Sequence, residues 1–210
     1  MATWNDWFVS AKNKNFNLER YLKVDQPSDL KRLYSSGLPC FDYLPVKGSN
    51  YSSKEVKEFI IAHKSIWVRV IDHRLQKRQS KLEMKNFDEF EAFLKSLPFN
   101  LNDCSIQLYQ MEKNEFGGNV ISSPKLTLIE IAYGLQDIVG KSTEPFFHGK
   151  INSHGRLEFV ESNVPNKIIL ASKKVLSYLK KSRESYLEGY FEFAISFDGK
   201  VYFMDYKTGF

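Results

Sequence analysis

The chain has 210 residues, 42% of them hydrophobic and 15% aromatic, which is enough apolar surface for an ordered core and excludes a disordered protein. Thirty basic and 25 acidic residues give a formal net charge of +5, too mild an excess to indicate nucleic-acid binding by itself. The sequence lacks an 18-residue apolar stretch and starts with polar and aromatic residues, so we expect neither a membrane span nor a secretion signal. Two distant cysteines without metal-ligand spacing predict a cytoplasmic protein with ordinary thiols.

The first half of the sequence alternates between short helices and strands. Residues 1–25 predict an N-terminal arm, and Ser28 suits the N-cap of a helix that Gly37 would end. Further helices are predicted over residues 52–64 and 86–97, and strands over residues 39–46 and 65–72. The charged segment 73–85 fits either a loop or an exposed strand.

The second half predicts antiparallel β-structure. Strands are predicted over residues 105–112, 117–122 and 125–134, and a helix over residues 166–187. A glycine-punctuated stretch from Gly134 to Gly155 precedes the helix, and a hairpin follows it. Because helices and antiparallel strands are mixed, we predict an α+β fold. We expect two lobes, residues 26–103 and 104–210, with a mainly antiparallel sheet in the second.

The most informative segment is the C-terminal one, where two alternating strands flank Asp198-Gly199, a strong hairpin signal. With these two residues in the turn, Phe197 faces Lys200. The same register sets Glu192 directly opposite Asp205. The apolar face that it predicts comprises Phe191, Phe193, Ile195, Tyr202, Met204 and Tyr206.

Glu192 and Asp205 form a candidate metal site, with Lys207 on the same side of the hairpin. Two carboxylates that face each other across a ladder repel unless a positive charge neutralises them. Two oxygen ligands and a nearby ammonium suit a magnesium ion that holds a polyphosphate. A solvated face on which Lys207 pairs with Asp205 fits the spacing equally well.

Basic residues offer candidate phosphate contacts. Arg69 is the one charge inside the apolar run 65–71, so it needs an anionic ligand or an internal carboxylate as its partner. The segment 73–85 carries Arg74, Lys77, Arg78, Lys81 and Lys85. A solvated face is the default interpretation of this segment, with a phosphate-binding loop and a nucleic-acid surface as alternatives.

Three further features have open interpretations. Glu130 lies in an apolar strand, where a buried carboxylate would need a cation or a ribose hydroxyl, although it fits a solvent-facing position equally well. Gly117-Gly118 is interpreted as a hairpin turn or as backbone beside an adenine. His148 and His154 lie next to glycines and are predicted to be surface histidines rather than a phosphohistidine or a metal pair.

Taken in order, these segments resemble the ATP-grasp nucleotide-binding domain of the phosphoenolpyruvate synthase and pyruvate phosphate dikinase family. The resemblance runs from about Gln26 to the C-terminus. LKRLYSSGLPCFDYLPV is similar to the opening helix and Gly-Leu-Pro-Val-Pro turn of that family, and YQMEKNEFGGNV is similar to its adenine-binding hinge. IEIAYGLQDIVGK, residues 129–141, is similar to a motif that ends Trp-Gly-Leu-Gly-Glu.

The resemblance implies a two-lobed ATP-grasp-like fold that binds ATP and Mg²⁺. It implies that Arg69 contacts the transferred phosphates and that Lys207 offsets the charge developing on them. It assigns the metal to Glu192 and Asp205. It also implies that Gln110, Met111 and Glu112 offer backbone groups to the base. Glu130, Arg74 and Lys77 are further candidate nucleotide contacts, with Arg74 and Lys77 in the segment that replaces the family's glycine-rich loop.

The departures from that family limit the expected activity. Gln26 stands where the family has a phosphate-binding lysine, with Lys23 nearby, and residues 73–85 replace a glycine-rich loop. The phosphohistidine carrier domain and the pyruvate-binding barrel are absent, so we do not expect the chain alone to make phosphoenolpyruvate. We expect ATP-dependent phosphoryl transfer to an acceptor, either a small molecule or a protein partner. The alternatives are a non-catalytic nucleotide-binding or scaffold module and, more weakly, a nucleic-acid-binding protein.

Overall fold

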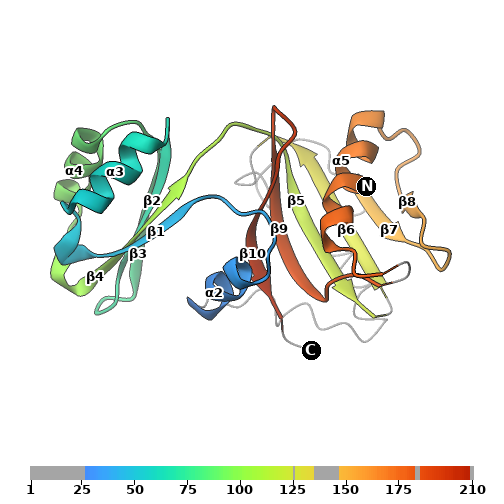
Figure 1. The fold of residues 1–210 in the computed structure, drawn as a ribbon, viewed down its shortest axis with the longest axis horizontal. Helices are drawn as coiled ribbons and strands as arrows, with labels where there is room; N and C mark the ends of the chain where they lie inside the picture. Colours follow the sequence, from blue (N-terminus) through green and yellow to red (C-terminus); the bar gives the residue numbers. More distant parts are fainter. Residues whose placement is uncertain (1–26, 125, 135–146, 183–184, 209–210) are drawn as a thin grey trace. The chain divides into compact units, whose positions relative to one another are not determined.

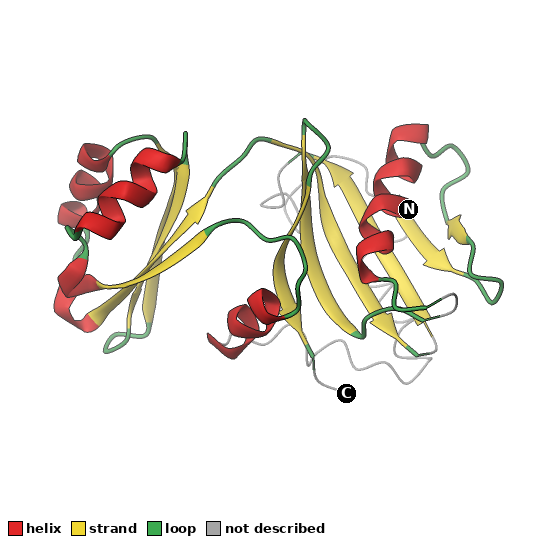
Figure 2. Cartoon of the chain, viewed as in Figure 1, coloured by secondary structure: helices red, strands yellow, loops and turns green. Residues whose placement is uncertain are grey.

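The computed structural model describes residues 27–124, 126–134, 147–182 and 185–208 (Figure 1). The chain divides into a smaller unit, Phe41–Lys113, and a larger unit formed by the chain before and after it. Each unit has its own antiparallel sheet and its own hydrophobic core (Figure 2). The predicted α+β class is therefore confirmed.

The smaller unit is a four-stranded sheet in the order β1-β4-β2-β3, with every neighbouring pair antiparallel. Its strands are β1 (Tyr43–Lys47), β2 (Ile66–Asp72), β3 (Lys77–Met84) and β4 (Cys104–Gln110). Its helices are α3 (Lys54–Ala62) and α4 (Phe87–Ser96), with short 3₁₀ turns η2 (Gly48–Asn50) and η3 (Leu101–Asp103). The side chains of Ser53 and Asn86 cap α3 and α4 by accepting from the backbone N–H groups of Val56 and Glu89.

Both helices of the smaller unit cover one face of its sheet (Figure 1). Their apolar stripes supply Val56 and Ile60 from α3 and Phe90 and Leu94 from α4. Alternate residues of β2 complete this core, because successive side chains of a strand point to opposite faces. The other face of the sheet carries the remaining side chains of β1, β2 and β4.

The larger unit is a six-stranded antiparallel sheet in the order β10-β9-β5-β6-β7-β8. Its strands are β5 (Asn114–Ser123), β6 (Leu126–Tyr133), β7 (Phe147–Ile151), β8 (Leu157–Phe159), β9 (Gly189–Ser196) and β10 (Val201–Lys207). The helix α2 (Pro27–Ser35) packs beside β10 through Leu33, and Gly37 follows it with a φ of 75°. The connection after α2 then joins β10, where the Phe203 N–H donates to the Pro39 carbonyl.

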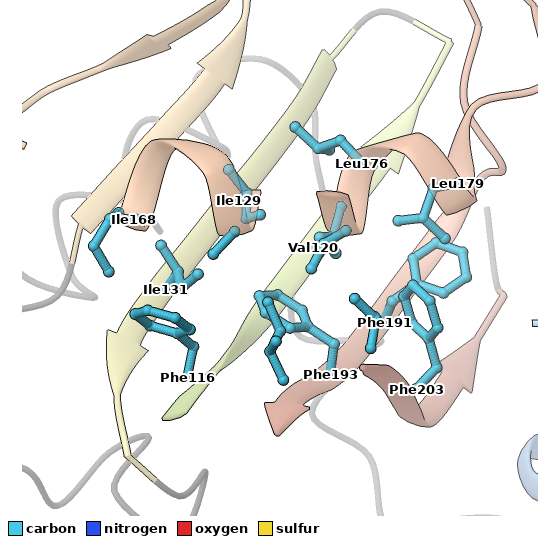
Figure 3. Close-up of a cluster of buried hydrophobic side chains, with 14 of the residues drawn as sticks. Phe116, Val120, Ile129, Ile131, Ile168, Leu176, Leu179, Phe191, Phe193 and Phe203 are labelled. Carbon is cyan, nitrogen blue, oxygen red and sulfur yellow. The ribbon is translucent and has the colours of Figure 1, made fainter. Parts of the chain in front are cut away.

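The helix α5 (Asn166–Leu179) lies on one face of this larger sheet and buries its apolar side against it (Figure 3). Val175, Leu176 and Leu179 from α5 meet phenylalanines from β9 and β10 in the core. The helix was predicted to reach residue 187, and that boundary is wrong. The chain turns back after Leu179, since the Leu187 N–H donates to the Leu179 carbonyl.

In the β9–β10 hairpin, Glu192 pairs with Asp205 as predicted, but the turn and the register next to it differ from the prediction. Three residues, 197–199, form the turn between Ser196 and Lys200, and Gly199 has a φ of 78°. This extra residue shifts the register by one near the turn. An irregularity around Met204 shifts it back before Asp205.

The register shift changes which side chains face the core. Val201 and Phe203 point into the core in place of the predicted Tyr202 and Met204, whereas the predicted β9 residues and Tyr206 lie there as expected. Phe191 stacks on Tyr206 at a centroid distance of 4.5 Å.

The predicted lobe boundary after residue 103 differs from the observed division. It falls at the start of β4, and β4 lies in the centre of the smaller sheet between β1 and β2. The chain enters the larger unit at β5 instead. The predicted arm over residues 1–25, Lys23 and Gln26, and the end of the motif over residues 129–141 lie outside the described residues.

None of the helices in the described part of the chain combines the length and the apolar character needed to cross a membrane.

Replacing Phe193 with Ala should lower the free energy of unfolding by about 3–5 kcal/mol, because a fully buried ring leaves a cavity in a close-packed core. Phe197 belongs to the same hairpin but is 69% exposed, so Phe197→Ala should change it by about 0.5 kcal/mol or less. Urea unfolding followed by circular dichroism compares the two variants. Equal losses would contradict the core assignment.

Candidate functional site

A row of polar side chains crosses the larger sheet on the face opposite its core. Strand pairing sets Asp205 of β10 beside Glu192 of β9, Glu192 beside Asn119 of β5, Asn119 beside Glu130 of β6, and Glu130 beside His148 of β7. Neighbouring strands lie about 4.8 Å apart, so the row spans about 19 Å. Four of the five are buried, and Glu192 is half-buried.

Lys207 neutralises one end of this polar row. Its ammonium lies 2.8 Å from Asp205 Oδ2, and the two side chains are only 13% and 11% exposed. The same ammonium lies 5.8 Å from the centre of the Tyr190 ring, close enough for a cation–π contact. The predicted pairing of Lys207 with Asp205 is therefore present, but the predicted solvated face is wrong because both groups are buried.

Tyr190 links two members of the row. Its hydroxyl oxygen lies 2.9 Å from Glu192 Oε1 and 3.0 Å from Asn119 Oδ1. Burial, followed by the charge of Glu192, raises the pKa of Tyr190, so the phenol keeps its proton. A phenol has one proton and cannot donate it to both acceptors.

The charged acceptor Glu192 is the stronger partner for that single proton. Asn119 must then donate to the Tyr190 oxygen, which requires its amide oxygen and nitrogen to exchange places. The exchange also gives a partner to Asn119 Nδ2, a buried donor that otherwise has none among the described residues. After the exchange, the amide oxygen of Asn119 is an acceptor in the polar row, next to Glu192 and Glu130.

His148 joins the other end of the row through two carboxylates. Its Nδ1 lies 2.7 Å from Glu161 Oε1 and its Nε2 lies 3.4 Å from Glu130 Oε1. Its backbone N–H also donates to Glu161 Oε2. The predicted surface position of His148 is wrong, since the residue is 7% exposed, and so is the solvent-facing alternative for Glu130, which is 5% exposed. The predicted surface position of His154 is confirmed.

The two carboxylates decide the protonation of His148. Burial acts to lower the pKa of His148, but hydrogen bonds to Glu130 and Glu161 and their charges outweigh it, and the pKa lies above its ordinary value of 6.5. The imidazolium form therefore holds the two acids together.

Gly118 lets the strands that carry the row approach each other. A Cβ at this position would lie 2.0 Å from the Glu130 carbonyl oxygen and 2.8 Å from the Phe193 ring. Gly117 and Gly118 both lie inside β5, so their interpretation as a hairpin turn is wrong. The role of Gly118 in the structure is close backbone packing.

Arg69 lies in the smaller unit, on the sheet face opposite α3 and α4. Its guanidinium lies 4.7 Å from the centre of the Trp67 ring, which stacks on Tyr109 at 4.8 Å. Tyr43 continues the stack at 4.9 Å from Tyr109. The stack restricts the planar guanidinium of Arg69 to one orientation, a geometry that suits recognition of a phosphate or carboxylate. Tyr109 and Tyr43 come from strands distant in sequence, so the residues around Arg69 do not indicate this stack.

The predicted hinge, residues 110–112, lies at the end of β4 and just beyond it. The backbone N–H groups of Gln110 and Met111 already donate to the Asp42 and Ser65 carbonyls. These two donors are therefore not available to an adenine. The predicted contact to the adenine would therefore have to use Glu112 and the backbone carbonyl oxygens of residues 110–112.

The basic segment forms β3 and the turn before it, which confirms an exposed strand. Register sets Arg78 on the same sheet face as Arg69 and sets Lys77 and Lys81 on the face that α3 and α4 cover. Arg74 lies in the turn, where its backbone N–H donates to the side chain of buried Asp72. These basic residues therefore do not form one phosphate-binding surface.

The oxygen donors on β10, β9 and β5 fit a hard divalent cation. Within the described residues, no three Asp, Glu, His or Cys side chains are grouped so that they could hold a metal ion. Glu192, Asp205 and the amide oxygen of Asn119 nevertheless come from adjacent strands in direct register. Mg²⁺ commonly takes one or two carboxylates and completes its shell with water and phosphate oxygens, so this set fits a magnesium ion shared with a ligand.

Solved structures with a related arrangement of elements include several ligases. The ATP-grasp ligase PsnB, complexed with precursor peptide PsnA2 and AMPPNP, aligns with 91% of this chain and 52% of its own, with 10% identity and a TM-score of 0.42. The macrocyclase MdnC from Microcystis aeruginosa, bound with precursor peptide MdnA, aligns over 84% and 51%, with 13% identity and a TM-score of 0.43. N5-carboxyaminoimidazole ribonucleotide synthetase, in its ADP complex, aligns over 85% and 42%, with 14% identity and a TM-score of 0.45.

The chain thus spans about half the length of these structures. No protein-family model matches the sequence, and no curated protein matches it either.

Replacing Tyr190 with Phe should lower the free energy of unfolding by about 1–3 kcal/mol, because it removes a donor from half-buried Glu192 and a partner from buried Asn119. Tyr178 is 45% exposed, and Tyr178→Phe serves as the control, with an expected change below about 0.5 kcal/mol. Equilibrium urea unfolding measures both. A Tyr190→Phe variant as stable as the control would contradict the network.

The raised pKa of His148 predicts a stability that falls as the pH rises. Its contribution is fully present below the unfolded-state pKa near 6.5 and is lost as the pH rises through the higher folded-state pKa. Unfolding free energies measured from pH 5 to 9 should therefore show a smaller alkaline loss in His148→Gln than in the unchanged protein. His154→Gln, at an exposed histidine, should keep the original pH profile. NMR titration showing a His148 midpoint at or below pH 6.5 would contradict the stabilisation of the imidazolium by Glu130 and Glu161.

Proposed function

We propose that this protein binds ATP together with Mg²⁺ on the polar face of the larger sheet, as an ATP-grasp-like protein. The observation that carries the proposal is the row of oxygen donors on β10, β9 and β5, buried on the face opposite the core. The ordered motif resemblance to the phosphoenolpyruvate synthase and pyruvate phosphate dikinase nucleotide-binding domain agrees with it. The reaction that we infer is phosphoryl transfer to an acceptor supplied by a small molecule or a partner protein.

Charge on the row favours a cation over a bare anion. Asp205, Glu192 and Glu130 are carboxylates, and Glu161 adds a fourth through His148. Lys207 and protonated His148 offset only part of this charge. A polyphosphate alone would be repelled, whereas one that arrives with a divalent cation would be attracted.

In this proposal Glu192, Asp205 and Asn119 hold the magnesium ion. The ion would neutralise the phosphate oxygens and withdraw charge from the transferred group. Tyr190 orients Glu192 and Asn119 through its hydroxyl. Lys207 keeps a positive charge beside Asp205, where it would stabilise charge that develops during transfer.

The remaining nucleotide contacts are proposals that rest on the sequence motifs. Arg69, held against Trp67, is the proposed contact to the transferred phosphates. Glu130 remains a proposed contact to the ribose. The other proposed contacts are Gln110, Met111, Glu112, Arg74 and Lys77. Gln110 and Met111 would have to contact the base through groups other than their backbone N–H, and Lys77 lies on the sheet face opposite Arg69.

A second candidate function is nucleotide binding without turnover. The buried pair of Lys207 with Asp205 favours it, because a metal ion bound at Asp205 would compete with an ammonium already 2.8 Å away. Separating two buried partners costs several kcal/mol when one is left without compensation. Release of ADP by the purified chain, with magnesium present, distinguishes the enzyme from the binding module.

ATP should stabilise the protein clearly with magnesium and only weakly without it. At a hundredfold excess over Kd, binding adds about 2.7 kcal/mol to the free energy of unfolding. Asp205→Asn should remove most of the magnesium-dependent gain, because the amide cannot supply the negative charge that holds the ion. Calorimetric titration and thermal melts, each with and without Mg²⁺, measure these effects.

Asp198→Asn provides the matched control. Asp198 lies in the same hairpin, but its side chain is 54% exposed and pairs with Lys200. This variant should bind magnesium-ATP like the unchanged protein. Absence of any nucleotide binding at millimolar ATP would refute the proposed function, and equal loss in both variants would refute the assignment of the metal to Asp205.

A further inference from the structure

The outer side of α5 and the tip of the β9–β10 hairpin form one surface, which we call the α5 face. α5 contains no acidic residue over Asn166–Leu179. The lysines of this surface are Lys167, Lys173, Lys174, Lys180, Lys181 and Lys200. Among the described residues, two carboxylates adjoin it and each is already paired, Glu115 with Lys167 and Asp198 with Lys200. The α5 face is therefore strongly positive.

Three large apolar side chains stand out among these lysines. Leu170 is 58% exposed, Tyr178 is 45% exposed, and Phe197 at the hairpin tip is 69% exposed. They do not belong to the core, which the opposite side of α5 completes (Figure 3). Exposed apolar groups framed by one sign of charge are typical of an interaction surface.

Lys174 brings the hairpin tip and the helix together. Its ammonium donates to the Gly199 carbonyl, so the turn that carries Phe197 is held beside the middle of α5. Tyr178 is in turn anchored by an edge-on contact with the Phe203 ring of the core, at 6.3 Å between centroids. The apolar groups of the α5 face thus have fixed positions.

We propose that the α5 face binds an extended acidic peptide segment of a partner protein. Leu170 and Tyr178 are eight residues apart, or about 12 Å along the helix. An extended chain covers that distance in about four residues. The fitting segment therefore carries two apolar side chains about four positions apart, with Asp or Glu around them for the lysines.

Charge and surface shape favour a peptide over the other polyanions. A membrane-binding helix inserts a continuous apolar side, but the apolar side of α5 is already used by the core. The lysines, Tyr178 and Phe197 would also suit a single strand of nucleic acid, which the test below therefore includes. Leu170 has no ring on which a base could stack, and this exposed aliphatic side chain favours the peptide. Leucine, tyrosine and phenylalanine together suit apolar peptide side chains.

The test begins with a library of random 12-residue peptides displayed on phage and selected on the full-length protein. We expect enrichment of acidic sequences with two apolar residues three to five positions apart. A fluorescein-labelled peptide of the enriched sequence then reports the affinity by anisotropy. Leu170→Ser with Phe197→Ser should weaken binding at least tenfold, and Lys173→Glu with Lys181→Glu should weaken it at least as much.

Matched control variants come from the smaller unit. Ile61 is 83% exposed on α3 and Lys54 is exposed at its start, so Ile61→Ser and Lys54→Glu should leave the affinity within twofold. Circular dichroism confirms that each variant is folded. The proposal is overturned if no acidic consensus is enriched, or if the α5-face variants bind as well as the controls. It is also overturned if phosphatidylserine vesicles or a 20-nucleotide single strand of thymidine binds at the α5 face more tightly than the peptide.

Discussion

Strand register determines where charge lies in the larger unit, because a strand presents alternate side chains to opposite faces of its sheet. One face buries phenylalanines and aliphatic side chains against α5, and the other carries the polar row. A shift of one residue along β9 would put Glu192 into the core and Phe193 among the carboxylates. Burial of apolar side chains on one face therefore fixes the strand register, and with it the positions of the acidic residues on the other face. The acidic residues do not have to attract one another to lie together.

Pairing compensates the charges of the polar row. Each end has a cation: Lys207 beside Asp205, and His148 between Glu130 and Glu161. Buried ion pairs add little net stability, because the loss of hydration offsets most of the attraction. The six-stranded sheet is therefore stabilised by its apolar face. The polar face contributes a defined arrangement of acids, amide and phenol, which is the property that a binding site needs.

The sequence could predict those parts of the fold that depend on local patterns. The alternation in β2 and the hairpin near residue 198 follow from neighbouring residues, and both are present. The predicted N-cap at Ser28 is wrong, because α2 begins at Pro27 and Ser28 lies inside the helix. The pairing of Glu192 with Asp205 was predicted although the turn has three residues rather than two. The irregularity at Met204 restored the register that the turn had shifted.

Features that depend on distant strands could not be predicted in the same way. His148 is buried because Glu130 lies beside it on β6 and Glu161 reaches it from beyond β8. Nothing in the residues next to His148 indicates either partner. Asn119 likewise enters the row only through the order of strands β9, β5 and β6. The stack on Arg69 brings Tyr109 of β4 beside Trp67 of β2, more than forty residues earlier in the chain, so local sequence indicated the charge but not the rings that support it.

Lys207 connects the charge balance of the row to the choice between the two candidate functions. Its ammonium neutralises Asp205 in the structure, which lowers the field that attracts a metal ion at that end of the row. Toward the other end, among the described residues, His148 supplies a positive charge beside Glu130, and that charge is titratable. A magnesium ion arriving with ATP would therefore have to compete with Lys207 for Asp205. If Lys207 moves from Asp205 to the phosphates when the ion binds, the same positive charge first neutralises Asp205 and then the transferred group. Charge stabilisation of this kind is the main contribution that a protein makes to phosphoryl transfer.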